Sequence, residues 1–285
     1  MSKVAVVIDS TTLIPAELTQ GLPIFTIPLH LIWDGEDLLD GVDIKAEEFY
    51  QRLKHSNTLP KTSQVTPEAF KELYGRLLDE GNDILSIHLS GELTATINSA
   101  RIAQEAFPGA AIEPVDSRTG AMATGFHVLS AARAAAQGAS LQECKEIAIQ
   151  AQSHSNILFA LDTLEYLHLG GRIGGAAAFV GSLLQIKPIL ETRNGRIDAI
   201  EKVRTMSKAI DRLVDILEEQ IAGRFPVRLA ALHADVIELG ETILQSAKQR
   251  LGENNVVESI LTGISPVLGV HLGPGAVGIA FQAGM

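Results

Sequence analysis

The sequence predicts a layered α/β fold arranged in two domains. The chain has 285 residues, which matches two domains of about 150 residues each. Hydrophobic residues make up 46% of the chain and charged residues 20%, a balance typical of a globular protein. Short apolar runs alternate with helical patterns in the first half, and this alternation implies parallel strands. We place the domains at residues 1–150 and 151–285.

The first half contains four strand candidates separated by helices. The apolar runs lie at residues 4–8, 25–32, 84–89 and 110–115. A helix is expected from Thr66, a capping hydroxyl, with Pro67 in its first turn, and Gly81 ends it. Alanine-rich helices are expected at 93–107 and 122–137.

The second half follows a polar stretch at residues 150–156. We expect strands at 157–161, 228–232, 256–260 and 277–281, with amphipathic helices at 209–221 and 237–251. No formal charge occurs in the 27 residues after Glu258, but two prolines, six glycines and a histidine interrupt them. A lipid-exposed helix would leave broken backbone bonds there, so we interpret this segment as buried strands and a loop.

Charge and cysteine content limit the classes of function. Lys and Arg total 23 against 34 Asp and Glu, a formal net charge of −11, which argues against binding to nucleic acid or to anionic lipid surfaces. Cys144 is the only cysteine, so no internal disulfide can form. Five apolar residues before Asp9 are too few for a signal peptide. We therefore expect a cytoplasmic protein with no stable membrane anchor.

Polar residues follow three of the predicted strands, at residues 9–12, 90–91 and 116–117. Ligands of open parallel sheets bind beyond the carboxyl ends of the strands, so these turns suggest one site. Helix capping is the alternative, because Asp and Ser are favoured caps.

Two further segments are candidates for ligand contact. Residues 62–64, Thr-Ser-Gln, form either a solvated turn or a group of donors for an anion. Residues 273–278 match G-x-G-x-x-G, but no helix or acidic residue follows, so we reject a dinucleotide site. A tight loop that lets a ligand approach is expected at Gly273. The side chain of His271, two residues before this loop, has either a structural or a functional role.

Several common catalytic and metal-binding motifs are absent from the sequence. Ser90 is not in G-x-S-x-G, because position 88 is His, and no S-x-x-K, C-x-x-C or H-E-x-x-H occurs. No metal site is therefore expected. The acidic residues of segment 34–43 lack EF-hand spacing and predict a solvated loop.

Basic residues gather around a glycine-rich segment at 170–175, which leads into residues 176–184. Its Arg172 could form an ion pair or contact an anion. The residues that join it in a basic patch are Lys187, Arg193, Arg196, Lys202 and Arg204. This patch is either a solvated face or a docking surface for an acidic or phosphate-bearing partner.

An ordered set of short motifs resembles the DegV family and covers nearly the whole chain. The motifs are Asp9-Ser10, Thr62-Ser63-Gln64, Leu89-Ser90-Gly91, Asn98-Ser99-Ala100-Arg101, Asp116-Ser117, Leu164-Glu165-Tyr166-Leu167 with Gly170-Gly171-Arg172-Ile173, Lys187-Pro188-Ile189-Leu190, and His271 with Gly273-Pro274-Gly275. The resemblance implies an N-terminal domain with a mostly parallel three-layer sheet and a C-terminal domain with a mixed sheet. It also implies a long-chain fatty acid held between them, with no other cofactor.

The resemblance further implies a non-catalytic subunit that presents the fatty acid carboxylate to a separate ATP-dependent fatty acid kinase subunit. By position, Thr62, Ser90 and His271 would hold the carboxylate. Ser63, Gly91 and Gly273 would complete the ligand contacts, and Arg172 and Arg204 would face the kinase or the acyl phosphate. His168 and Leu169 stand where the family commonly has basic residues.

Two other functions stay open at this point. One is a serine hydrolase that uses Ser90 and His271. The other is a lipid-sensing adaptor without acyl-phosphate chemistry. Because each buried methylene of an acyl chain contributes on the order of 0.8 kcal/mol, a fatty acid site needs a long apolar lining, which an aliphatic sequence can supply.

Overall fold

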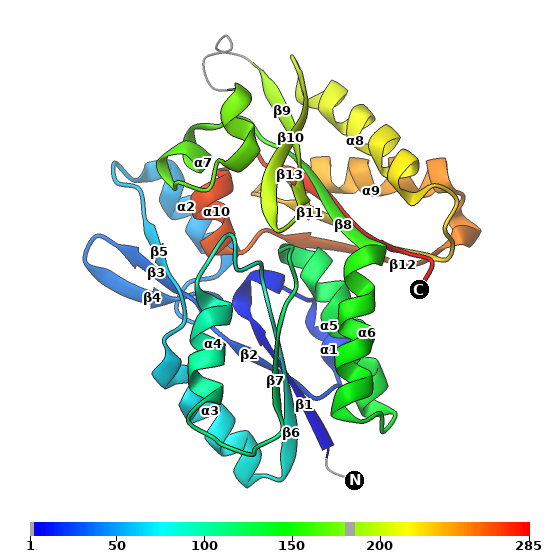
Figure 1. The fold of residues 1–285 in the computed structure, drawn as a ribbon. Helices are drawn as coiled ribbons and strands as arrows, with labels where there is room; N and C mark the ends of the chain where they lie inside the picture. Colours follow the sequence, from blue (N-terminus) through cyan, green and yellow to red (C-terminus); the bar gives the residue numbers. More distant parts are fainter. Residues whose placement is uncertain (1–2, 180–185) are drawn as a thin grey trace.

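The computed structural model of the chain describes residues 3–179 and 186–285, and these residues form three β-sheets (Figure 1). The first sheet has the strand order β2-β1-β6-β7, and every neighbouring pair is parallel. Its strands are β1 (Lys3–Asp9), β2 (Ile24–Ile27), β6 (Asn82–His88) and β7 (Ile112–Asp116). The expected parallel pairing is confirmed.

Helices cover both faces of this first sheet, which gives the three layers that were expected. They are α3 (Pro67–Asp79), α4 (Thr96–Gln104), α5 (Ala121–Ala136) and α6 (Leu141–His154). Because side chains alternate along a strand, Ala5 and Val7 share a core with α3 and α4, while Val4, Val6 and Ile8 share one with α5 and α6. Thr66 caps α3 by accepting a hydrogen bond from the amide of Ala69, as predicted.

The prediction of a single strand at residues 25–32 is wrong. The run divides at Pro28, and β3 (His30–Trp33) joins a small antiparallel sheet with β4 (Glu36–Leu39) and β5 (Lys61–Ser63). Proline has no N–H for a sheet hydrogen bond, which explains the break. Helix α2 (Ala46–His55) lies between β4 and β5 in the chain.

The acidic segment 34–43 is not simply a solvated loop, so that expectation is wrong for Asp40. Its side chain is only 1% exposed and accepts a hydrogen bond from the hydroxyl of Ser10 at 2.7 Å. Periodicity gives no sign of this contact, because the two residues lie on different elements.

The C-terminal half forms a six-stranded sheet in the order β10-β9-β8-β13-β11-β12. Only β11 and β12 pair in parallel, so the sheet is mixed, as expected. Its strands are β8 (Ser155–Ala160), β9 (Lys187–Arg193), β10 (Arg196–Val203), β11 (Val227–His233), β12 (Val256–Gly263) and β13 (Val277–Ala283). Helices α8 (Met206–Ile221) and α9 (Ile237–Leu251) cover one face (Figure 1).

Residues after Glu258 were expected to form strands and a loop, which is wrong for α10 (Pro266–Leu272). The hydroxyl of Ser265 caps this helix by accepting from the amide of Leu268, and Pro266 occupies its first turn. Gly273, with φ of 75°, ends it. His271 therefore lies in the last turn of a helix.

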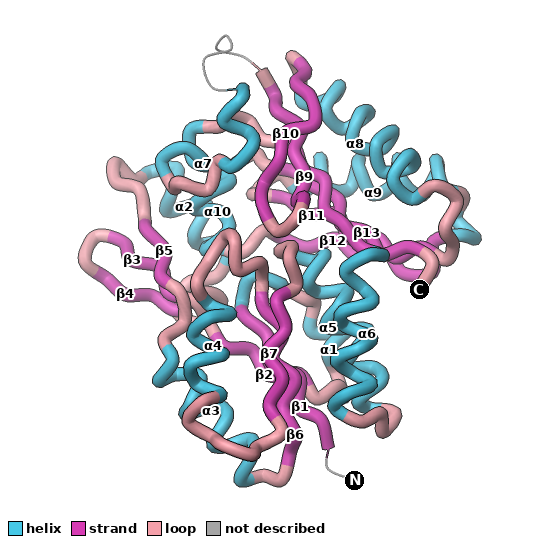
Figure 2. The backbone as a smooth tube through the Cα atoms, viewed as in Figure 1, coloured by secondary structure: helices cyan, strands magenta, loops and turns pink. Residues whose placement is uncertain are grey.

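The remaining elements are short (Figure 2). They are α1 (Ala16–Thr19), α7 (Glu165–Leu169), η1 (Ser10–Thr12), η2 (Gly174–Phe179) and η3 (Glu253–Asn255). Of the segment 176–184, residues 180–184 lie outside the described residues. The proposed domain boundary after residue 150 falls within α6 and stays a prediction. Within the described ranges, every helix is too short or too polar to cross a bilayer.

The largest apolar core crosses from one half of the chain to the other. It includes Met122 and Phe126 of α5, Phe159 of β8 and Leu232 of β11. The face of the mixed sheet that α8 and α9 leave uncovered is therefore directed toward the first domain.

Candidate functional site

A cavity of about 70 Å³ lies where β5, the loop after β6 and α10 meet; we name it the mouth cavity. Predicted site residues Thr62, Ser63, His271 and Arg172 line it together. The other lining residues are Leu29, Gln64, Leu89, Leu93, Thr94, Ile197, Val267, Leu268 and Leu272. The fold thus brings four of the eight predicted residues to one place.

Thr62 and His271 are hydrogen-bonded, with Oγ1 and Nε2 3.0 Å apart. They are separated by 209 positions in the sequence and lie on β5 and α10. Burial, and then the positive charge of Arg172, lower the pKa of His271 to about 4. His271 is therefore neutral at physiological pH, and one of its ring nitrogens carries a proton.

Arg172 is exposed and bridges two segments at the cavity. Its Nε donates to the carbonyl of Leu93 at 3.1 Å, and its Nη1 donates to the carbonyl of Gly170 at 2.8 Å. Since neither acceptor is a carboxylate, the charge of Arg172 is available to an anion in the mouth cavity.

An apolar cavity of about 60 Å³ adjoins the mouth cavity. The two share Leu93, Ile197, Leu268 and Leu272. The remaining lining residues are Gly120, Ala121, Ile157, Phe159, Thr192, Leu232, Ile264 and Gly278. They come from both halves of the chain, and among the described residues of this wall only Thr192 has a polar side chain.

A wider space of about 400 Å³, the vestibule, opens on the other side of the polar pair. It shares Thr62, Arg172 and His271 with the mouth cavity. Leu59 and Leu169 also line it, and they are 48% and 60% exposed. The Thr62–His271 pair therefore stands between a buried apolar space and an open one.

The other predicted site residues do not line the mouth cavity, the apolar cavity or the vestibule. Ser90 is fully buried, and its hydroxyl accepts from the amide of Glu92 at 3.2 Å. Gly91 donates to the carboxylate of Asp116. Gly273 packs against the ring of Tyr166. Arg204 is exposed after β10.

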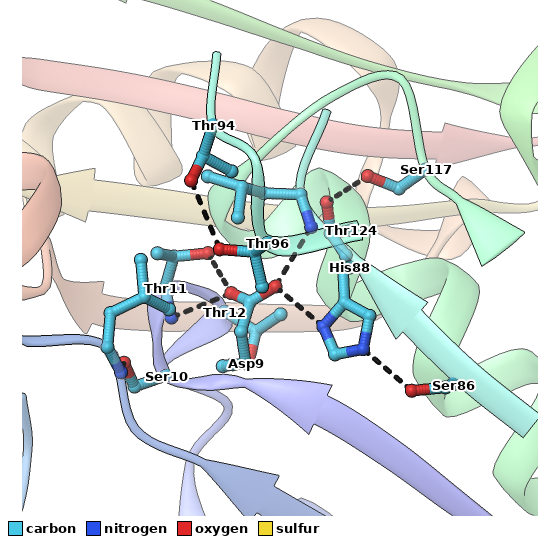
Figure 3. Close-up of polar contacts among 12 residues, drawn as sticks. Asp9, Ser10, Thr11, Thr12, Ser86, His88, Thr94, Thr96, Ser117 and Thr124 are labelled. Atoms are coloured by element: carbon cyan, nitrogen blue, oxygen red, sulfur yellow. Dashed lines mark hydrogen bonds and ion pairs between the residues drawn. The ribbon is translucent and has the colours of Figure 1, made fainter. Parts of the chain in front are cut away.

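A buried polar network lies beneath the site, at the carboxyl ends of the parallel strands (Figure 3). Oδ2 of Asp9 lies 3.1 Å from Nδ1 of His88 and accepts from the amide of Leu89 at 2.9 Å. Nε2 of His88 lies 2.7 Å from the hydroxyl of Ser86. Burial raises the pKa of Asp9, but hydrogen bonds and the His88 charge outweigh it and bring the net pKa below its usual value.

The three turns predicted to form one site do meet in this region. The amide of Ser117 donates to the carbonyl of His88, and the amide of Ser90 donates to the carbonyl of Thr119. Asp9 also caps η1 by accepting from the amide of Thr11, so the capping alternative is confirmed for this turn, and a ligand site formed by the three turns stays a prediction. Sequence reasoning singled out Asp9 but not His88, whose position two residues before Ser90 was the available signal.

Three of the six cations of the predicted basic patch form ion pairs. Arg193 pairs with Glu191, Arg196 with Glu92, and Lys187 with Asp162. These three cations therefore do not offer free charge to a partner. No group of three or more possible metal ligands occurs in the described part of the chain.

The fold and the cavities define an α/β protein with an apolar cavity between its four-stranded and six-stranded sheets and a polar pair at the mouth. The family model described as "Uncharacterised protein, DegV family" matches residues 3–284. The chain therefore belongs to the DegV family, which confirms the resemblance.

Relatives and solved structures agree with this assignment. The chain is 36% identical over 281 residues to a DegV domain-containing protein of Listeria innocua, with 98% of both chains covered. A structure described as fatty acid binding of a DegV family protein from Thermus thermophilus matches with a TM-score of 0.90 and 31% identity, covering 99% of both chains. The structure of DegV, a fatty acid binding protein from Bacillus subtilis, matches with a TM-score of 0.90 and 33% identity, covering 99% of this chain and 100% of that one.

Proposed function

We propose that this protein binds one long-chain fatty acid, with the carboxylate in the mouth cavity and the chain in the apolar cavity. The carrying observation is that the two cavities share four apolar side chains, so the Thr62–His271 pair lies at one end of an apolar space. The fatty acid binding described for the Thermus and Bacillus relatives supports the same ligand class.

The residues at the mouth suit a carboxylate, which must keep hydrogen bonds when it leaves water. With neutral His271 protonated at Nε2, the imidazole donates to Thr62 Oγ1, and the Thr62 hydroxyl hydrogen is left for the ligand. Arg172 adds a positive charge beside them. Ser63 also lines the mouth. Ser90, Gly91 and Gly273 stay predictions as ligand contacts.

Burial of the acyl chain supplies most of the binding free energy. At on the order of 0.8 kcal/mol per methylene, about 14 methylenes contribute roughly 11 kcal/mol before the cost of association. One water needs about 10–15 Å³ of cavity space. The two cavities, of about 70 and 60 Å³, therefore have room for on the order of ten groups the size of a water molecule. A long acyl chain has more methylene groups than that. The shared side chains, including Leu268 and Leu272, must move apart on binding.

We further propose that the protein does not itself catalyse but presents the carboxylate to an ATP-dependent kinase subunit through the vestibule. Exposed Leu59 and Leu169 beside the polar pair support a docked partner there. The hydrolase alternative needs a bond between Ser90 and His271. His271 instead pairs with Thr62, and Ser90 accepts from Glu92, which disfavours that reading.

The decisive experiment is to extract freshly purified protein and to identify the released ligand by mass spectrometry. We expect about one long-chain fatty acid per chain. If no lipid is released and the protein does not bind added hexadecanoate, the proposal is wrong. The kinase step is tested separately by adding ATP and a cognate kinase subunit, where acyl phosphate is expected only with both proteins present.

A further inference from the structure

The far end of the apolar cavity is bordered by polar groups. A crevice of about 490 Å³, here named the polar crevice, lies between the loop after β7 and the turn of the β9–β10 hairpin. Thr192 lines both this crevice and the apolar cavity. The polar crevice has no lining residue in common with the mouth cavity.

Two backbone segments also pass directly from one space to the other. In the loop after β7, Arg118 and Thr119 line the crevice, while Gly120 lines the apolar cavity. On β8, Asn156 lines the crevice and Ile157 lines the apolar cavity. On three separate elements, the two spaces therefore have lining residues that are shared or adjacent in the sequence.

The crevice contains a cation that could receive an anion. The guanidinium of Arg118 donates to the carbonyl of Asn194 at 2.6 Å and forms no ion pair within the described residues. Arg193, by contrast, is paired with Glu191 and Asp198. The hydroxyl of Ser155 is also buried there, and no described residue hydrogen-bonds to it.

We propose that the polar crevice is the distal subsite of the acyl site and accepts the second carboxylate of a long-chain α,ω-dicarboxylic acid, with Arg118 as its cation. This inference rests on the proposed function and extends its substrate class. The first carboxylate occupies the mouth, the methylenes occupy the apolar cavity, and the far carboxylate passes Thr192 into the crevice. A closed apolar end would instead reject an ionised terminus, because burial of an unpaired charge is very costly.

The test compares the dissociation constants of saturated monocarboxylic acids and α,ω-dicarboxylic acids of 12 to 20 carbons, measured by calorimetry on the delipidated full chain. At the best chain length, we expect the diacid to bind within about tenfold of the monoacid, since Arg118 replaces water around the second charge. A diacid that binds more than about a thousandfold more weakly at every length would overturn the inference while leaving the proposed function intact. If neither ligand binds, both proposals fail.

Variants of crevice residues test whether diacid binding depends on the crevice. Arg118→Met is expected to weaken diacid binding at least about tenfold and to leave monoacid binding unchanged, because only the diacid reaches the guanidinium. Arg76→Met, which removes the same charge from α3, should change neither constant. Ser155→Ala, which removes the unpartnered hydroxyl of the crevice and touches neither the apolar cavity nor the mouth, provides a second variant and should also weaken the diacid selectively. Equal losses for both ligands, or no loss in either crevice variant, contradict the proposal.

Discussion

Asp9 and His88 form a completely buried pair, with Oδ2 and Nδ1 3.1 Å apart and both side chains at 0% exposure. Their strands, β1 and β6, are neighbours in the parallel sheet. The same Asp9 carboxylate also accepts from the amides of Leu89 and Thr11. One charged group thus connects the ends of two strands beneath the mouth cavity, which predicts a large structural cost when it is removed.

Asp9→Asn should lower the free energy of unfolding by about 3 kcal/mol, because the amide cannot satisfy the same donors in a buried site. Urea unfolding followed by circular dichroism measures the change. Asp79→Asn, the same substitution at an exposed position on α3, is the control and should change stability by less than about 0.5 kcal/mol. A loss at Asp9 as small as that of the control would contradict the structural role.

Asp40 makes stability depend on pH in the neutral range. Burial raises the pKa of Asp40 from 3.8 to about 7, while hydrogen bonds from Ser10 and from the backbone of Val267 lower it only in part. The neighbouring Asp9 charge raises it further. Because the folded pKa lies above the unfolded one, this contribution to stability is complete below about pH 4 and is lost as the pH rises to 7.

Asp40→Asn removes this titration. Between pH 5 and pH 8 we expect the variant to gain about 3 kcal/mol of unfolding free energy relative to the parent protein, since one pKa unit corresponds to about 1.36 kcal/mol. Urea unfolding at both pH values measures the difference. Asp79→Asn again serves as the control. A difference between variant and parent that is the same at pH 5 and pH 8 would show that Asp40 does not titrate in this window.

His127 should make stability fall as the pH is lowered, which is the opposite direction to the effect of Asp40. It lies within α5, only 1% exposed, and neither ring nitrogen has a hydrogen-bond partner among the described residues. Burial lowers its pKa from 6.5 to about 4. Its contribution to stability is therefore present above pH 6.5 and is lost as the pH falls to 4, because the unfolded chain binds the proton first.

His127→Leu should make unfolding less sensitive to acid. Between pH 7 and pH 4.5 the parent protein is expected to lose about 2 kcal/mol more than the variant. His55→Leu, at an exposed position on α2, is the matched control. Parallel losses in the His127 variant and the parent would be inconsistent with a buried neutral imidazole.

Gly170 positions the ring of His271. A Cβ at residue 170 would lie 2.2 Å from Nδ1 of His271 and 3.0 Å from the carbonyl of Tyr166. Its φ of −75° suits any residue, so Gly170→Ala acts through this clash alone. If the mouth binds the carboxylate, the variant should bind hexadecanoate at least about tenfold more weakly, because the displaced ring breaks its bond to Thr62.

The matched control is Gly75→Ala on α3, where a Cβ would make only an ordinary contact of 3.7 Å with Phe107. Alanine is a better helix former than glycine, so this variant should be as stable as the parent or more so. Titration of hexadecanoate into both variants separates the two effects. Undiminished affinity in the Gly170 variant would place the carboxylate elsewhere.

Local patterns predicted much of the fold where one element carries its own signal. The helix expected at 237–251 has those bounds in the structure, and Thr66 begins α3 as its cap. The capping box of Ser140 and Glu143 that begins α6 is likewise a signal within one short segment. The β9–β10 hairpin was missed, since its pairing depends on a neighbouring strand and not on an apolar run.

By itself, the sequence determined the alternation of strands and helices, the parallel first sheet and the family, because these follow from periodicity, caps and ordered motifs within short segments. Only the tertiary structure decided that Thr62 contacts His271 across 209 positions, that Ser90 bonds within its own loop, and that Asp40 is buried. Such contacts join side chains from separate elements. Their distances depend on how the sheets and α10 pack, which no local pattern encodes.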